Sequence, residues 1–225
     1  MGTRSRLLGA LLPGRCPVCE TPGPAPCGTC WAALRPSPPG SAVPAGLDGC
    51  RSLLRYEGVG RELVARLKYR NARSAVAWLA DGMAQLAATL VVTPPQPGPG
   101  PGLDVVTWAP TSRARRRARG FDQGEVLARA VARRLGVPCG PLLVRRPGPP
   151  QTGRSRAERR SGPAFVIGRG PPPVGARVLL VDDVVTSGAT LSSAADALRA
   201  AGAAAVLAVT AGRTPLKVPE RAADG

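Results

Sequence analysis

The apolar run 178–181 leads directly into two adjacent carboxylates, Asp182 and Asp183. A hydroxyl-rich turn follows them and consists of Thr186, Ser187, Gly188, Ala189 and Thr190. Residues 191–201 are helix-like, and the start of a helix offers unpaired N–H groups and a positive dipole end that favour phosphate. Carboxylates suit sugar hydroxyls or Mg²⁺. A phosphate in the turn would lie one sugar length from the acids, so the pattern predicts a site for a phosphorylated pentose.

The two adjacent acids impose a geometric condition on this site. In an extended strand the side chains of Asp182 and Asp183 would point to opposite faces. We therefore expect the strand to end near Val181 and the turn to rotate both acids toward one ligand. Neighbouring carboxylates also repel unless N–H groups, hydroxyls or a cation offset their charge. The turn supplies N–H groups and hydroxyls around a glycine.

The acid pair has three other interpretations. An apolar strand followed by two acids also describes a Walker B strand, but the chain contains no G-x-x-x-x-G-K-[ST] motif. A receiver domain uses adjacent acids early in its fold, whereas these stand near the end of the chain. The acids could also simply begin a turn and cap a helix. The combination of strand, acid pair, Thr-Ser-Gly turn and helix favours the ligand site.

Four cysteines near the start of the chain form two C-x-x-C pairs that are seven residues apart: Cys16, Cys19, Cys27 and Cys30. Two tight turns of this kind complete a tetrahedron of thiolates around Zn²⁺, which gives a closed structural site. Two disulfides are an alternative, but nothing indicates secretion. A redox C-x-x-C is another, although it normally sits at a strand–helix junction. Cys50 and Cys139 stand alone and are expected to be buried thiols.

Charge and composition narrow the chemistry further. The 225 residues carry a net charge of +17, from 31 Lys+Arg against 14 Asp+Glu, which favours anionic partners. The absence of histidine excludes His-based triads, bases and metal ligands. We expect residues 113–119, with five arginines, to form a basic loop, and 145–161 to form a second basic stretch. Each would contact phosphate, track single-stranded DNA or be an ordinary solvated surface.

The elements that must position these groups alternate between strand and helix. The patterns predict strands over 53–56, 104–108, 142–144, 165–167, 178–181 and 205–210, and helices over 61–69, 75–90, 121–135 and 191–201. Such alternation predicts an α/β fold with an open, mainly parallel sheet and flanking helices. Ligands bind at the carboxyl ends of the strands in such sheets. The loops after Trp108 and Val144 should therefore share an edge with the acids.

The expected organisation divides the chain into four parts. These are a zinc-ribbon-like element with its linker (1–48), a helical hood or connecting region (49–102), the α/β domain (103–214) and a tail (215–225). No apolar stretch approaches the roughly 20 residues of a membrane span. The N-terminal leucines form too short a patch for a signal peptide. A cytoplasmic location is the resulting expectation.

Residues 178–190 resemble the thirteen-residue signature of type I phosphoribosyltransferases. The whole layout resembles more narrowly the ComF family, which combines an N-terminal four-cysteine zinc element with a phosphoribosyltransferase-like domain and is associated with competence for DNA uptake. Besides the cysteines, the matching pieces are Leu67-Lys68-Tyr69, Arg119-Gly120-Phe121-Asp122-Gln123, Gln151-Thr152, Ala157-Glu158-Arg159-Arg160 and Ala164-Phe165. Asp122 departs from the Asn that is common in the family, and Gly153-Arg154 stand where a Leu is usual.

The resemblance implies a role for each matching residue. Phosphoribosyl pyrophosphate (PRPP) would bind with Mg²⁺, its ribose hydroxyls at Asp182 and Asp183 and its 5′-phosphate at residues 186–190. The segment with Arg113, Arg117 and Arg119 would face the pyrophosphate. Residues 151–160, beginning with Gln151, would form a mobile flap. The implied reaction is displacement of pyrophosphate at C1 of the ribose, with an acceptor that the sequence does not identify.

Two further functions stay open at the level of sequence. One is a non-catalytic competence factor that keeps the fold and binds single-stranded DNA through its basic surface, alongside proteins of the competence machinery. The other is a zinc-dependent protein–protein adaptor built on residues 1–35. In the first of these, the PRPP site could still act as a sensor.

Overall fold

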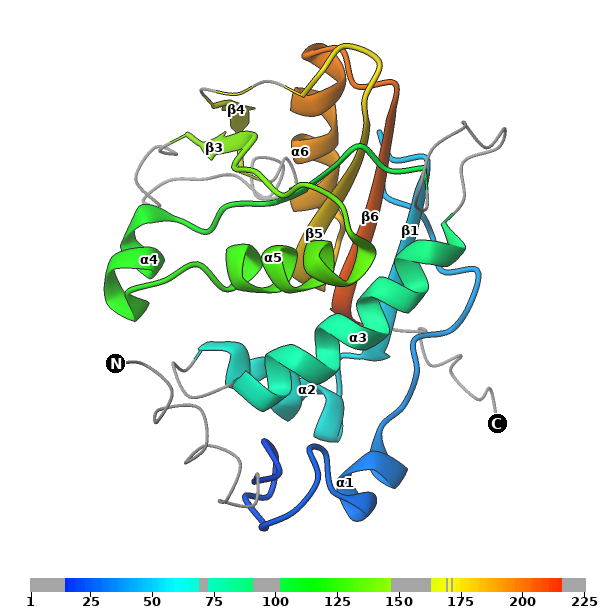
Figure 1. The fold of residues 1–225 in the computed structure, drawn as a ribbon, viewed down its shortest axis with the longest axis vertical. Coiled ribbons are helices and arrows are strands. Elements are labelled where there is room, and N and C mark those ends of the chain that lie inside the picture. The colour runs from blue at the N-terminus through cyan, green and yellow to red at the C-terminus, as the bar shows by residue number, and fades with distance from the viewer. Residues whose placement is uncertain are drawn as a thin grey trace, which may run out of the picture.

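Four parallel strands form the central sheet of the computed structural model, which describes residues 15–68, 73–90, 102–146, 163–168, 170 and 172–215. The strands are β1 (Gly49–Arg55), β2 (Val105–Trp108), β5 (Arg177–Val185) and β6 (Ala205–Arg213), in the spatial order β1-β6-β5-β2. Each neighbouring pair runs parallel. The predicted α/β fold with a parallel sheet and flanking helices is confirmed (Figure 1).

Helices cover both faces of this sheet. The helices α3 (Arg73–Thr89) and α5 (Gln123–Leu135) lie on one face, and α6 (Ala189–Ala200) lies on the other (Figure 1). The strand β5 explains this arrangement, because its apolar run is buried on both sides: Leu179 and Val181 belong to the cluster under α3 and α5, whereas Val178 and Leu180 belong to the cluster under α6. A strand buried on both faces needs such a continuous run.

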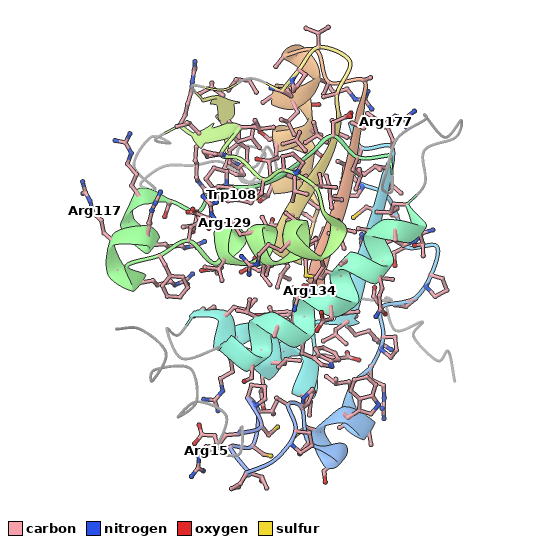
Figure 2. The ribbon with its side chains drawn as sticks, viewed as in Figure 1. Arg15, Trp108, Arg117, Arg129, Arg134 and Arg177 are labelled. Atoms are coloured by element: carbon pink, nitrogen blue, oxygen red, sulfur yellow. The ribbon has the colours of Figure 1, made fainter. Side chains whose placement is uncertain are left out.

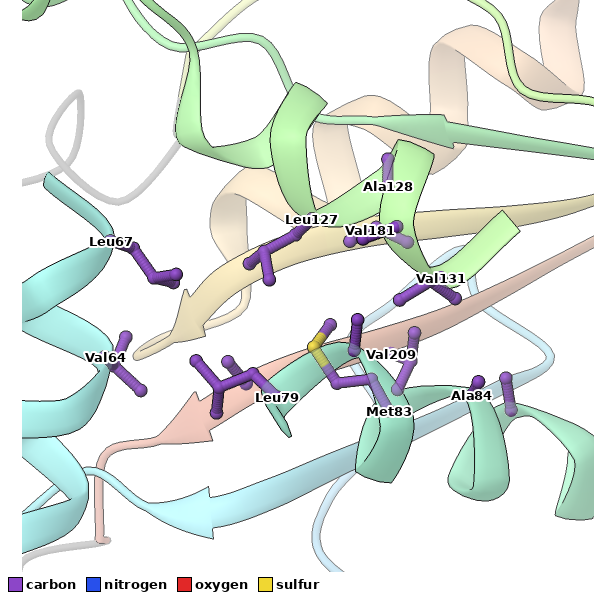
Figure 3. Close-up of a cluster of buried hydrophobic side chains, with 14 of the residues drawn as sticks. Val64, Leu67, Leu79, Met83, Ala84, Leu127, Ala128, Val131, Val181 and Val209 are labelled. Carbon is purple, nitrogen blue, oxygen red and sulfur yellow. The ribbon is translucent and has the colours of Figure 1, made fainter. Parts of the chain in front are cut away.

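The core between the sheet and the two helices is built from aliphatic side chains (Figure 3). Leu79 and Met83 of α3 and Leu127 and Val131 of α5 are fully buried there, as is Val209 of β6. Arg134 adds a polar connection between the helices (Figure 2), since it pairs with Asp81 and donates from Nη2 to the carbonyl oxygen of Ala77 at 3.0 Å. The two helices therefore pack together as one layer on this face of the sheet.

The region 49–102, which we expected to be a helical hood or connecting region, contributes a strand to the sheet. Within it, β1 pairs with β6, and the helix α2 (Gly58–Ala65) and the 3₁₀ turn Arg66–Lys68 follow β1. Leu63, Val64 and Leu67 from this segment lie in the same buried cluster as the residues of α3 and α5. This region and the α/β domain thus share one sheet and one core.

Two predicted strands form a sheet of their own instead of joining the parallel one. The strands β3 (Leu143–Arg145) and β4 (Phe165–Ile167) pair with each other in antiparallel fashion. The outer edge of β2 is already occupied, because the N–H of Val106 donates to Pro138 at 2.8 Å and the N–H of Gly140 donates to Val106 at 3.0 Å. The chain leaves the central sheet after this contact and builds the small sheet beside α6 (Figure 1).

Residues 113–119 are helical, so the prediction of a basic loop is wrong. The helix α4 (Arg113–Arg119) begins at Ser112, whose hydroxyl accepts the N–H of Arg115, and ends at Gly120 in the left-handed conformation. Arg and Ala are good helix formers, and a Ser cap with a Gly end fixes both boundaries. No helix in the described part of the chain is long and apolar enough to cross a membrane.

Candidate functional site

The strand β5 continues through both acids and ends at Val185, so the prediction that it ends near Val181 is wrong. Its neighbour β6 extends to Arg213 and pairs with β5 over this whole length, with Asp182 opposite Thr210. Both carboxylates accept a hydrogen bond from the backbone N–H of the next residue, and Asp183 also accepts one from the helix α5. Asp182 accepts the N–H of Asp183 at 2.8 Å, and Asp183 accepts the N–H of Val184 at 2.8 Å and the side-chain amide of Gln123 at 2.7 Å.

A polar pocket of about 170 Å³ lies at the carboxyl ends of β2 and β5. It is formed by the loop after β2, the start of α5, the end of β5 and the start of α6. Its lining residues are Ala109, Pro110, Thr111, Arg115, Asp122, Gln123, Gly124, Arg145, Asp182, Asp183, Val184 and Thr190. Both acids and Thr190 were predicted site residues, and the structure brings these three together as expected of an open parallel sheet.

Three carboxylates line this pocket, and two of them are costly to ionise. Burial raises the pKa of Asp182 well above its ordinary value, and the adjacent charge of Asp183 raises it further. Burial also raises the pKa of Asp122, although the N–H groups of Thr111 and Gly124 oppose that shift. A divalent cation or a ligand rich in hydroxyls would relieve this repulsion. The donor set therefore fits Mg²⁺, which prefers carboxylate oxygens and water.

Asp122 fixes the loop that carries the chain from β2 to α4. One carboxylate oxygen accepts the N–H of Gly124 at 3.0 Å and caps α5, and the other accepts the N–H of Thr111 at 2.8 Å. In the sequence, Asp122 stands out only at the start of a helix and as part of a motif. An acid directly before a helix is a capping signal, but its second bond to Thr111 depends on the tertiary fold.

None of the three predicted arginines lines the pocket itself. Arg119 is partly buried and donates to the side-chain oxygen of Gln123. Arg113 and Arg117 are exposed and do not line the pocket, and Figure 2 shows Arg117 pointing away from the sheet. Arg115, which lies between them on α4, lines the pocket instead. Arg115 lies within the predicted basic segment but is not singled out by the sequence, because a segment expected to be a loop has no helical periodicity to show which arginines share a face.

Other predicted site residues are placed as follows. Thr186 and Ser187 are exposed in the turn after β5, and Ala189 begins α6. Gln151 and the rest of the expected flap, 151–160, lie outside the described residues. Arg145, which was not among the predicted site residues, reaches the pocket from β3.

Gly188 closes the turn in the left-handed conformation, with φ of 81°, and contacts the linker that follows the cysteine element. A Cβ atom at this position would lie 2.8 Å from Cγ of Pro44. Gly136 ends α5 with a similar φ of 67°, but a Cβ atom there would meet nothing within 4 Å. The two glycines therefore share a backbone requirement and differ in the space around them.

Comparing alanine variants of the two glycines separates the cost of backbone strain from the cost of crowding against Pro44. We expect Gly136→Ala to cost about 1–2 kcal/mol of unfolding free energy, because an L-residue is strained in this conformation. Gly188→Ala should cost roughly 1–3 kcal/mol more, because the added methyl group must displace Pro44. Urea unfolding of both variants measures the difference. Equal losses would show that Pro44 does not press on the turn.

The four cysteines of the N-terminal element converge as predicted. Their sulfur atoms all lie within 4.8 Å of one another, and those of Cys19 and Cys27 are 3.6 Å apart. Zn–S bonds of about 2.3 Å in a tetrahedron place sulfur atoms about 3.8 Å apart.

Burial raises the pKa of the Cys30 thiol to about 12, with the neighbouring thiols adding to the shift. Burial acts in the same direction at Cys16, but backbone hydrogen bonds outweigh it and lower the pKa to about 6. The cluster can bind a metal ion such as zinc.

This element is attached firmly to the rest of the molecule. Arg66 donates to the carboxylate of Glu20 and to the carbonyl oxygen of Val18, at 3.0 and 3.1 Å. The rings of Trp31 and Trp78 meet edge to face, with centroids 5.5 Å apart. Cys16 and Cys30 belong to the buried cluster that also contains the residues of α3. The cysteine element is therefore continuous with the main core.

Comparison with known proteins relates this architecture to one domain family. The model of the phosphoribosyl transferase domain matches residues 122–223, a range that includes α5, both acids and the turn. Orotate phosphoribosyltransferases from Sinorhizobium medicae (strain WSM419) and Rhizobium meliloti (strain 1021) are each 36% identical over 86 residues. That match covers 38% of this chain and 36% of each relative, so the chain spans about a third of their length.

Solved structures of such proteins are more distant. A glutamine PRPP amidotransferase from B. subtilis is 22% identical, with a TM-score of 0.40 over 65% of this chain and 30% of the other. An orotate phosphoribosyltransferase from Aeropyrum pernix is 21% identical, with a TM-score of 0.37 over 73% and 71% of the two chains. The domain match at residues 122–223, together with the parallel sheet, supports a phosphoribosyltransferase-like fold for this part of the chain.

Proposed function

We propose that this protein binds PRPP together with Mg²⁺ in the pocket at the carboxyl ends of β2 and β5. The observation that carries the proposal is the convergence of Asp182, Asp183 and Thr190 on one polar pocket, with Thr190 in the first turn of a 12-residue helix. Carboxylates suit ribose hydroxyls or Mg²⁺, and a helix start suits phosphate. The match of residues 122–223 to the phosphoribosyl transferase domain supports it.

Each part of the ligand would have its own set of groups. The turn 186–190 would hold the 5′-phosphate through backbone N–H groups and hydroxyls. Asp182 and Asp183 would hold the ribose hydroxyls, either directly or through Mg²⁺. Arg115 and Arg119 of α4 would face the pyrophosphate, because guanidinium groups bind phosphate oxygens through two N–H groups.

These groups would favour displacement of pyrophosphate at C1 of the ribose. Positive character develops on the sugar in such a transition state, and the carboxylates of β5 would stabilise it while they orient the ring. Arginines of α4 would stabilise the charge on the leaving group. Bound Mg²⁺ would neutralise part of that charge. The expected flap, 151–160, would exclude water from the reaction.

We further propose membership of the ComF family and a link to DNA uptake. The support is the resemblance of residues 119–123 and of the signature 178–190, together with a four-cysteine cluster at the N-terminus. Exposed arginines on α4, at positions 113, 116 and 117, favour a second candidate function, which is binding of single-stranded DNA. That function predicts binding that weakens steeply with salt and survives replacement of both acids by Asn.

Isothermal titration calorimetry with PRPP tests the first proposal. We expect saturable binding in the presence of Mg²⁺ and much weaker binding without it, with ribose 5-phosphate and pyrophosphate competing for the same site. An absence of heat at millimolar PRPP would contradict the proposal. A screen of nucleobases and amines for pyrophosphate release would then identify the acceptor.

A further inference from the structure

The side chain of Gln123 connects the helix α4 to the acid pair on β5. Gln123 is the first residue of α5 and 9% exposed, while the preceding Asp122 caps that helix. The amide nitrogen of Gln123 donates to Asp183 at 2.7 Å, and its amide oxygen accepts from Nη1 of Arg119. A nearly buried polar side chain thus bridges β5 and the end of α4.

The chemistry of the two partners fixes the orientation of this amide. Asp183 presents a carboxylate oxygen, which only accepts, and Arg119 presents N–H groups, which only donate. A flipped amide would place oxygen against oxygen and nitrogen against nitrogen. Gln is also neutral, so it adds no fourth negative charge to a pocket that already holds Asp122, Asp182 and Asp183. It separates Arg119 from Asp183 and leaves the charges of both available to a ligand.

We infer that Gln123 is a positioning residue that couples Asp183, on the sugar side of the site, to Arg119, on the pyrophosphate side. This inference rests on the proposed function. Through the bridge, an arginine engaged by the pyrophosphate would hold the carboxylate at its place beside the sugar. The coupling requires a group with a donor on one side and an acceptor on the other.

Replacing Gln123 by Leu removes both hydrogen bonds and keeps a side chain of similar size. Loss of a hydrogen bond to a charged group costs roughly 10- to 100-fold in affinity, and we expect a loss in that range for Mg²⁺–PRPP. The variant Arg119→Ala should cost a similar factor, and the double variant should cost less than the product of the two. The variant Gln85→Leu, at an exposed position of α3, serves as the control and should bind as the wild type does.

The variant Gln123→Glu separates positioning from a merely structural role. When ionised, the introduced carboxylate accepts from Arg119 but repels Asp183; when it is protonated, its O–H donates to Asp183 and its other oxygen still accepts from Arg119. The affinity of this variant, relative to wild type at the same pH, should therefore recover as the pH falls from about 8 to about 5.5. The charged groups around position 123 that enter this titration are Asp122, Asp182, Asp183, Arg115, Arg119 and Arg145.

The possible results separate a failure of the proposed PRPP binding from a failure of the proposed role of Gln123. If the wild type does not bind PRPP, the proposed function fails and this inference fails with it. If the wild type binds but Gln123→Leu binds equally well, or Gln123→Glu shows the same relative affinity at every pH, the inference alone is overturned. Should Gln123→Leu not fold, the comparison of Arg119→Ala in the wild-type and Gln123→Glu backgrounds tests the same coupling.

Discussion

Replacing Asp182 by Asn should greatly weaken Mg²⁺–PRPP binding and at the same time raise the unfolding temperature of the unliganded protein. Binding should fall by about 100-fold or more, because a charged group that bonds the ligand or its metal is lost. The stabilisation has a separate cause. Burial and the charge of Asp183 raise the pKa of Asp182, so at neutral pH its ionised form destabilises the fold.

The sign of this effect gives it a characteristic pH dependence. A carboxyl group whose pKa is raised in the folded state stabilises the fold fully when the pH is below its pKa in the unfolded chain, about 3.9. This stability is lost as the pH rises through the higher pKa of the folded state. Asn has no such loss. The variant should therefore exceed the wild type in Tm at pH 7, by about 2–4 °C for each kcal/mol relieved, and the difference should vanish near pH 4.

Thermal unfolding in Mg²⁺-free buffer from pH 4 to pH 8 measures this difference, with calorimetry for the ligand. Asp196→Asn is the matched control, because Asp196 lies exposed on α6 and should change neither property appreciably. A variant that binds PRPP normally would contradict the assignment of Asp182 to the ligand site. A variant that is less stable than the wild type at pH 7 would contradict the claim that ionised Asp182 destabilises the fold.

We propose that the four cysteines hold zinc, and its removal should destabilise the whole protein and not only its first 35 residues. Structural zinc contributes on the order of 10 kcal/mol to the folding of small elements, and here Cys16 and Cys30 belong to the same buried cluster as Leu63 and Val64 of α2. We expect a fall in Tm of about 10 °C or more on chelation, and a similar fall for Cys30→Ser.

Metal analysis and unfolding in the presence of a chelator provide the test. The edge-to-face pair of Trp31 and Trp78 offers a fluorescence signal for release of the element from α3. Cys139→Ser is the control, since this thiol stands apart from the cluster and is only partly buried. A preparation that contains no zinc and keeps its Tm in chelator would show that the four thiols do not need a metal.

The parts of the fold that were predictable from sequence depend on local patterns. The apolar run 178–181 identified the central strand, and Asp122 and Gly136 marked the ends of α5 closely. The spacing of the four cysteines identified their cluster. Each of these signals lies in neighbouring residues, so no knowledge of distant partners was needed.

The remaining features depend on contacts between distant segments. The strand β5 continues past Val181 because β6 supplies hydrogen-bond partners as far as Arg213. The strands β3 and β4 leave the parallel sheet because residues 138–140 already occupy the edge of β2. Gln123 bridges two groups that lie 4 and 60 residues away in sequence. Such pairings leave no periodic trace in the sequence.

A crystal structure of the protein with PRPP and Mg²⁺ would show directly whether the ligand occupies the pocket beside Asp182 and Asp183. We expect the 5′-phosphate at the turn 186–190, the ribose hydroxyls or the metal at Asp182 and Asp183, and the pyrophosphate facing Arg115 and Arg119. Ligand density elsewhere on the basic surface, with an empty pocket beside the two acids, would contradict it.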